Sequence, residues 1–179
     1  ARPHSAGKRP WPMVDTYYKV PGAAGINSDI KDMALYMEAQ MGEMPDVADA
    51  KVLNTIHGRY VVTPGERGRM RKFLERLGKA WYGYGWRSYD YAEHQIIGHR
   101  GGIKGYRSLI LFDPVKKSGV VALWNSDTWQ PGGLEFEVMD QIYHLPFRDW
   151  LEINKSPAET IAAAEDDSSD SGDNADRGR

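Results

Sequence analysis

The sequence predicts an α/β domain of the α+β type, an antiparallel sheet of at least three strands with flanking helices. Two apolar runs, 108–112 and 120–125, are separated by the turn sequence 113–119. A third run, 95–97, precedes a stretch with four glycines, 98–105. Turn signals between strand-like runs are typical of an antiparallel meander. Helical apolar periods elsewhere supply the flanking helices.

The composition indicates one globular domain. The chain has 179 residues, 41% of them hydrophobic, and six tryptophans, enough for a core. Residues 157–179 hold seven acids and two bases, which leaves 18 acids and 21 bases in residues 1–156, too mild an excess to argue for nucleic acid. The absence of cysteine excludes disulfides, thiolate nucleophiles and cysteine zinc sites. No apolar run has the length of a membrane span.

The two ends of the chain differ from its middle. Ala1-Arg2-Pro3-His4 is neither an initiator methionine nor a signal peptide, so we expect the chain to begin inside a larger protein. Residues 1–21 predict an extended segment laid over a surface. From about Ser156 the composition predicts a disordered acidic tail, 156–179, after a domain at 1–155. An interaction tail is the alternative and has no specific support.

Two helices are predicted in the first third of the chain. The first runs from Asp29 to Met41, with Ser28 as N-cap and Gly42 as its stop. Its apolar face holds Ile30, Met33, Ala34, Met37 and Met41. A shorter helix is predicted from Asp49 to His57.

A third helix is predicted to begin at Thr63-Pro64-Gly65-Glu66 and to run to about Leu77. Its apolar stripe holds Met70, Phe73, Leu74 and Leu77, and its other side holds Arg67, Arg69, Arg71, Lys72 and Arg76. The basic side could bind nucleic acid or anionic lipid. A solvated face is favoured, because no aromatic or glycine pattern accompanies it.

The remaining elements follow in order. Residues 82–91 alternate aromatic with small or polar residues, which predicts one strand with an aromatic face. Residues 92–94 turn the chain into a strand that begins at Gln95 and ends at His99. After the strands at 108–112 and 120–125, a helix is predicted at 134–143, with Leu134, Val138 and Ile142 on one side and Pro146 beyond its end.

Candidate catalytic groups are few. Ser-x-x-Lys occurs at Ser5–Lys8 and at Ser28–Lys31, a spacing in which the lysine can take the serine proton. Ser28 is better explained as a helix cap, and the aspartates beside Lys31 would keep it protonated. None of the five histidines lies at metal-ligand spacing, so no metal or cofactor is predicted.

The glycine-rich stretch Gly98-His99-Arg100-Gly101-Gly102 is the remaining candidate. Glycines allow close approach of a ligand or backbone, and histidine can change charge near neutral pH. On spacing alone, a glycine-rich hairpin with a surface histidine and no function is favoured. The position of this stretch at the start of the predicted meander instead favours a functional site.

Several motifs, in their order, resemble the serine β-lactamase-related hydrolases, which include class C β-lactamases, D,D-peptidases and esterases. They are Ala1–His4, Pro21–Ser28 with Asp32-Met33-Ala34, Tyr82–Trp86, Gly98–Gly102, Gly105-Tyr106 and Leu123-Trp124-Asn125. The resemblance covers residues 1 to about 150 and only the second half of the family's domain. It implies part of a β-lactamase/transpeptidase-like fold.

The resemblance also implies site residues. His99-Arg100-Gly101 matches the family's His-x-Gly motif on the strand that lines the active site, and Gly102 matches the backbone oxyanion donor. The expected catalytic residues are therefore His99, Gly101 and Gly102, and the expected substrate-binding residues are Arg100, Ile103 and Tyr106. The family's Ser-x-x-Lys and Tyr-x-Asn motifs do not occur at the expected places, so the nucleophile is expected upstream of Ala1.

The implied function is acyl transfer to serine and hydrolysis of an ester or amide, in a periplasmic or secreted protein. The expected partners are an acyl substrate and the missing half of the domain, and this chain alone is expected to be inactive. The alternative is a non-catalytic binding or split-half module that acts through a partner chain. A nucleic-acid binder that uses the basic side at 67–76 is a third, less favoured possibility.

Overall fold

The computed structural model describes residues 1–7, 9–13 and 26–154. Lys8, most of the predicted turn at 21–27 and the predicted acidic tail lie outside these ranges. The elements are α1 (Ile30–Gln40), α2 (Ala50–Ile56), β1 (Val61–Val62), α3 (Pro64–Arg69), a 3₁₀ turn η1 (Arg71–Phe73), β2 (Leu77–Tyr82), β3 (Arg87–Tyr91), β4 (His94–Ile103), β5 (Tyr106–Asp113), β6 (Ser118–Trp124) and α4 (Leu134–Ile142).

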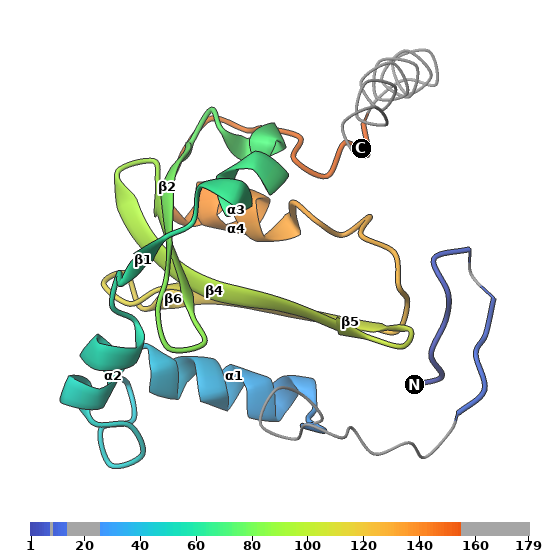
Figure 1. Ribbon diagram of the computed structural model, residues 1–179, viewed down its shortest axis with the longest axis horizontal. Coiled ribbons are helices and arrows are strands. Elements are labelled where there is room, and N and C mark those ends of the chain that lie inside the picture. The colour runs from blue at the N-terminus through green and yellow to red at the C-terminus, as the bar shows by residue number, and fades with distance from the viewer. Residues whose placement is uncertain (8, 14–25, 155–179) are drawn as a thin grey trace, which may run out of the picture.

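The strands form one six-stranded antiparallel sheet in chain order, β1-β2-β3-β4-β5-β6. Two-residue turns join β3 to β4 at Ala92-Glu93 and β4 to β5 at Lys104-Gly105, and all four residues have positive φ (46°, 68°, 36° and 83°). Such turns match the twist of paired strands. The predicted meander is confirmed (Figure 1).

Helices cover both faces of the sheet: α1 and α2 lie on one, called the α1 face, and α3 and α4 on the other, called the α4 face (Figure 1). The core on the α1 face contains Met41, Trp86, Ile97, Ile110 and Phe112. The larger core on the α4 face includes Met70, Phe73, Leu77, Ile96, Leu111, Phe136 and Met139. Strand alternation explains why neighbours in β4 enter opposite cores.

The prediction of one helix from Thr63 to about Leu77 is correct only for its first turns and wrong for the rest. α3 ends at Arg69, η1 follows, and Leu77 begins β2 by pairing with Tyr91. The Thr63 side chain makes no capping hydrogen bond. Glycines at 65 and 68 weaken the helix, and pairing with β3 outweighs what remains of its propensity.

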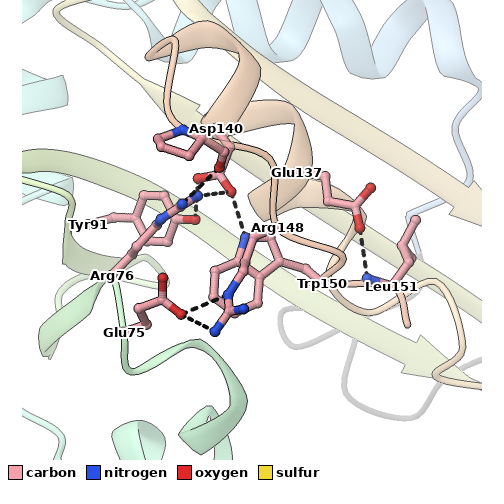
Figure 2. Close-up of polar contacts among 9 residues, drawn as sticks. Glu75, Arg76, Tyr91, Glu137, Asp140, Arg148, Trp150 and Leu151 are labelled. Carbon is pink, nitrogen blue, oxygen red and sulfur yellow. Dashed lines mark hydrogen bonds and ion pairs between the residues drawn. The ribbon is translucent and has the colours of Figure 1, made fainter. Parts of the chain in front are cut away.

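The basic side of this segment is only partly solvated. Arg69 is exposed, but Arg76 pairs with the buried carboxylate of Asp140 on α4 (Figure 2). The interpretation as a solvated face is therefore wrong for Arg76. A nucleic-acid patch that needs this arginine loses support.

The strand predicted over 82–91 is instead a hairpin. β2 ends at Tyr82 and β3 begins at Arg87. The turn between them is closed by the Gly83 N–H, which donates to the Trp86 carbonyl at 2.8 Å, and Gly85 has φ 79°. The glycines allow a reversal that the aromatic alternation concealed.

The first helix has Asp29, rather than Ser28, as its N-cap. The Asp29 carboxylate accepts from the Lys31 and Asp32 N–H groups at 2.8 and 3.0 Å. The predicted stop is confirmed at Gly42, where φ is 81°. The short helix predicted from Asp49 to His57 is observed as α2, with those two residues as its caps.

The buried face of α4 differs from the predicted one. Phe136 and Met139 are fully buried, whereas Leu134, Val138 and Ile142 are only partly buried. Two carboxylates, Glu135 and Asp140, are also buried on this helix and accept hydrogen bonds. Buried charges within the inner face broke the apolar pattern on which the prediction depended.

The N-terminal segment is not one extended stretch as predicted: its described part folds back on itself, His4 pairs antiparallel with Pro10, and the Trp11 N–H donates to the Pro3 carbonyl at 2.8 Å. The segment lies beside the tip of the β4–β5 hairpin, where the Ala1 carbonyl accepts from the Tyr106 hydroxyl at 2.6 Å. The Arg2 carbonyl accepts from the Asn125 side chain at 2.8 Å. Within the described ranges no helix has the length and apolarity to cross a membrane.

Gly98→Ala is expected to lower the free energy of unfolding by about 1–3 kcal/mol, as overpacking does. A Cβ at this position in β4 would lie 2.4 Å from the Ile110 carbonyl oxygen, and this backbone of a central strand cannot move aside. Urea unfolding followed by circular dichroism measures the change.

Gly65→Ala is the matched control, because a Cβ at Gly65 in α3 would meet nothing within 4 Å. Alanine there should be neutral or should stabilise by up to about 1 kcal/mol. Equal stabilities of the two variants would contradict the close approach at Gly98.

Candidate active site

The second half of β4 has an unpaired edge. β3 pairs with β4 only as far as Arg87 opposite Gly98, whereas β4 continues to Ile103 and stays paired with β5 throughout. Among the residues that the structure describes, no strand joins residues 99–103 on the β3 side. The predicted His-x-Gly motif lies on this edge, which we call the 99–103 edge.

The hairpin after β4 determines which backbone groups face the 99–103 edge. In a two-residue hairpin the closing pair, here Ile103 and Tyr106, exchanges both hydrogen bonds. Alternate residues of an antiparallel strand direct their N–H groups to opposite sides. The N–H groups of Gly102 and Arg100 therefore point to the unpaired side, where an acceptor can reach them.

The side chains of the predicted site residues have different surroundings. His99 is opposite Ile110 in β5, and its exposed ring lies beside Tyr82 of β2. Arg100 points to the α4 face, where its Nε donates to the Glu135 carboxylate at 2.7 Å. Ile103 is 40% exposed. The Tyr106 hydroxyl is bonded to the N-terminal segment.

Three further residues surround His99. The Tyr82 ring lies edge-on at 6.3 Å between ring centroids, and the Arg87 guanidinium lies over Tyr82 at 5.0 Å. Glu66 from α3 pairs with Arg87 at 3.4 Å. Sequence reasoning missed these residues, because only the pairing of β2, β3 and β4 brings them to the edge.

The surroundings of His99 favour a neutral imidazole. Burial lowers its pKa below the usual 6.5, and the Arg87 cation lowers it further. A hydrogen bond with the Arg100 backbone and the Glu66 carboxylate act in the opposite direction. At pH 7 the ring is therefore unprotonated and can accept a proton or a hydrogen bond.

Arg87→Gln is expected to raise the pKa of His99, because it removes the cation that opposes protonation. Glu66→Gln should lower this pKa, since it removes the charge that favours the imidazolium. The ring Cε1–H resonance, followed by NMR across pH 4–8, reports the pKa. Lys79→Gln, at an exposed lysine of β2, is the control and should leave the titration unchanged. A downward shift in Arg87→Gln would contradict this arrangement.

Gly102 has a second reason to lack a side chain. A Cβ there would lie 2.3 Å from Nη1 of Arg107, which is opposite Gly102 in β5. The same guanidinium stacks on the Trp129 ring at 4.1 Å and pairs with Asp127 at 3.6 Å. Gly101 is less restricted, with Ser108 Oγ 3.3 Å from a Cβ built there.

A separate pocket of about 690 Å³ lies near the beginning of β4, away from the 99–103 edge. Its lining includes Leu53, Ile97 and the buried His57, whose Nε2 is 2.9 Å from Gln40 Oε1. Burial lowers the pKa of His57 to about 4, which keeps the ring neutral. None of the predicted site residues lines this pocket. In the described ranges no cluster of three or more His, Asp or Glu is placed to hold a metal.

Comparisons with known proteins show which family and fold the chain resembles. A family model described as beta-lactamase matches residues 1–143. A similar solved structure is that of the octameric penicillin-binding protein homologue from Pyrococcus abyssi, with 22% sequence identity and a TM-score of 0.57. The match covers 70% of this chain and 26% of that one, so this chain spans about a quarter of that relative. No curated protein matches the sequence. At this identity the likeness shows the fold alone, and it confirms the predicted α+β class.

Proposed function

Because this chain belongs to the beta-lactamase family of serine hydrolases, we propose that it supplies the His-x-Gly strand to an enzyme that hydrolyses an ester or amide through an acyl-serine. The single observation that carries the proposal is the 99–103 edge. An unpaired strand that offers a backbone donor beside a histidine supports this proposal, because acyl transfer needs a donor for the oxyanion that develops on the carbonyl oxygen.

Each group on the edge has a defined task in this proposal. The Gly102 N–H donates to the carbonyl oxygen as negative charge develops on it in the tetrahedral intermediate. His99 orients a group near the nucleophile or accepts a proton from it. Gly101 leaves room for the substrate to approach the strand. Ile103 and Tyr106 would lie beside the bound acyl group.

The nucleophile would come from sequence upstream of Ala1, so residues 1–155 would be one part of a larger catalytic domain. Exposed apolar side chains on α1 support this: Ile30, Leu35 and Tyr36 are 53%, 51% and 44% exposed. Apolar residues on a helix that borders the sheet usually meet a partner. A non-catalytic split-half module is the alternative, because a separate partner chain could cover the same residues.

The oxyanion role of Gly102 has a sharp test in the full-length natural protein. Gly102→Pro removes the N–H donor and is expected to lower kcat by about 100-fold or more. Gly102→Ala is the matched control, because it meets the same Arg107 guanidinium but keeps the donor. Equal kcat values for the two variants, measured with a nitrophenyl ester, would show that this N–H does not act.

The location of the nucleophile is tested by labelling with a fluorophosphonate and a penicillin, read by intact mass. The full-length protein should form one adduct on an upstream serine, and this chain alone should form none. An adduct on Ser28 would contradict the proposal and make Ser28 and Lys31 the catalytic pair. A full-length protein without an adduct or turnover would favour the split-half module.

A further inference from the structure

The tip of the β4–β5 hairpin projects beyond its neighbours in the sheet. On one side β3 stops opposite Gly98, and on the other β6 stops at Trp124, opposite Arg107. Within the described ranges, residues 103–106 therefore have no partner strand outside the hairpin itself. A hairpin of two strands without such support is marginally stable in water. Because the 99–103 edge runs into this tip, its position depends on what holds the tip.

The beginning of the chain packs against the tip of the hairpin (Figure 1). Residues 1–7 and 9–11, which we call the clip, fold back on themselves at the bridge between His4 and Pro10. Two backbone hydrogen bonds of 2.8 Å close the clip on either side of this bridge. The clip is therefore a compact unit against which the hairpin can be held.

Gly105, in the turn of the hairpin, lies in direct contact with the clip. A Cβ at Gly105 would lie 2.8 Å from the Cβ of Pro3 and 2.9 Å from the backbone nitrogen of His4. Pro3 is buried, and next to it the Ala1 carbonyl accepts from the Tyr106 hydroxyl at 2.6 Å. Gly105 also has a φ of 83°, so both the turn and the close approach require glycine.

The loop after β6 holds the clip from its other side. The Asn125 side chain donates to the Arg2 carbonyl at 2.8 Å, and the Ser126 hydroxyl donates to the Ser5 carbonyl at 3.1 Å. Both acceptors are backbone groups of the clip. These hydrogen bonds therefore fix the path of the clip, and they involve no residue of the hairpin.

Asp127 connects the clip to the hairpin. Its N–H donates to the His4 carbonyl at 3.0 Å. Its carboxylate accepts from the Gly105 N–H at 3.1 Å and lies 3.6 Å from the Arg107 guanidinium. Arg107 is opposite Gly102, so this network reaches the residue that carries the proposed oxyanion donor.

We infer that the clip and the loop after β6 hold the oxyanion donor in place, with Asn125 and Asp127 as positioning residues. The inference rests on the proposed function and adds how the Gly102 N–H keeps its position on an edge that no strand supports. A donor stabilises the oxyanion best when it is already in place before the charge develops. A tip that moves should therefore lower the rate of reaction and leave substrate affinity unchanged.

Amide hydrogen exchange in the full-length natural protein tests whether the clip holds the tip. Asn125→Ala removes a donor to the clip and alters no residue of the hairpin. Exchange of residues 103–106 is expected to quicken about fivefold, the effect of about one hydrogen bond, while residues 109–112 in the core part of β5 stay unchanged. Asn54→Ala, at an exposed asparagine of α2, is the matched control. Unchanged exchange at the tip, or an equal increase at 109–112, would overturn the inference.

Two substitutions of Asp127 separate its hydrogen bond from its bulk. Asp127→Asn keeps an oxygen that can accept from the Gly105 N–H, so exchange at the tip should stay close to that of the unsubstituted protein. Asp127→Ala removes this acceptor and should quicken exchange at the tip as Asn125→Ala does. Equal exchange in the two Asp127 variants would contradict a positioning role for its carboxylate.

Turnover of a nitrophenyl ester shows whether the position of the tip matters for the reaction. Asn125→Ala is expected to lower kcat about tenfold at an unchanged KM. This loss should disappear in the Gly102→Pro background, where the donor is already absent. A raised KM with an unchanged kcat, or the same loss in that background, would overturn the inference.

The two measurements separate failure of the inference from failure of the proposed function. A full-length protein without turnover would count against the proposed function, and hydrogen exchange would still decide whether the clip holds the edge. Quicker exchange in Asn125→Ala together with an unchanged kcat would leave the proposed function in place and overturn the positioning role.

Discussion

Asp140→Ala is expected to lower the free energy of unfolding by about 3–5 kcal/mol, the range for removing one partner of a buried ion pair. Asp140 is 2% exposed and joins three segments (Figure 2). It pairs with Arg76, accepts from the Tyr91 hydroxyl at 2.6 Å and accepts from the Trp150 indole N–H at 2.6 Å. The alanine variant leaves all three donors without their acceptor.

The Tyr91 hydroxyl remains a donor over the whole working range of pH. Burial raises the pKa of Tyr91 well above its usual value, and its hydrogen bond to Asp140 raises it further. The phenol therefore does not ionise beside the carboxylate, and the loss of Asp140 should destabilise the fold equally at pH 6 and pH 8. Urea unfolding at both values, followed by circular dichroism, measures this.

Glu75→Ala is the matched control, because Glu75 pairs with Arg148 beside the same network but at the surface, where the side chains are 47% and 55% exposed. An exposed pair contributes about 0–1 kcal/mol. If Asp140→Ala lowers stability no more than Glu75→Ala does, the network in Figure 2 does not hold the segment around Trp150 to α4.

Local turn chemistry explains which parts of the fold could be predicted. The segment 113–119 carries its own turn signal, and a two-residue turn links β3 to β4 where 92–94 was expected to reverse the chain. Both were predicted, because the residues that determine them are adjacent in sequence. The hairpin between Tyr82 and Arg87 was missed because its aromatic alternation fits a single strand equally well.

Interactions between residues distant in sequence determine the parts of the fold that could not be predicted. Met70, Phe73 and Leu77 have helical spacing and do enter one core, but they enter it from a 3₁₀ turn and a strand. Periodicity alone cannot separate these cases, because the pairing of Leu77 with Tyr91 depends on a segment elsewhere in the chain.

The same distinction between sequence neighbours and distant residues decides which parts of the candidate site could be predicted. His99 and Gly102 could be proposed from sequence, because they are neighbours on one strand. The contact between Arg100 and Glu135 could not be predicted. Glu135 lies on α4, and the apolar face predicted for this helix was at other positions. Sequence reasoning therefore expected Arg100 to bind substrate, and the structure gives its guanidinium a partner on the α4 face.

Glu135→Ala is expected to lower the free energy of unfolding by about 3–5 kcal/mol, because it leaves the Arg100 cation without its counter-charge. The Arg100 side chain is 26% exposed, so water compensates only part of this loss. Glu135 also accepts from the Gly133 N–H at 3.0 Å, so the variant removes a bond at the start of α4 as well. Urea unfolding measures the loss.

The double variant Arg100→Met with Glu135→Leu separates the charge from the packing. Apolar replacement of a buried pair is often neutral or stabilising, so the double variant should be more stable than Glu135→Ala and than Arg100→Met alone.

The pair also ties β4 to α4 directly beside Gly101 and Gly102, and the Phe136 ring lies 5.6 Å from the Arg100 guanidinium. Amide hydrogen exchange at residues 99–103 should therefore quicken in Glu135→Ala and recover in the double variant. Unchanged exchange in Glu135→Ala would mean that β5 alone holds the edge in place and that α4 does not position the site.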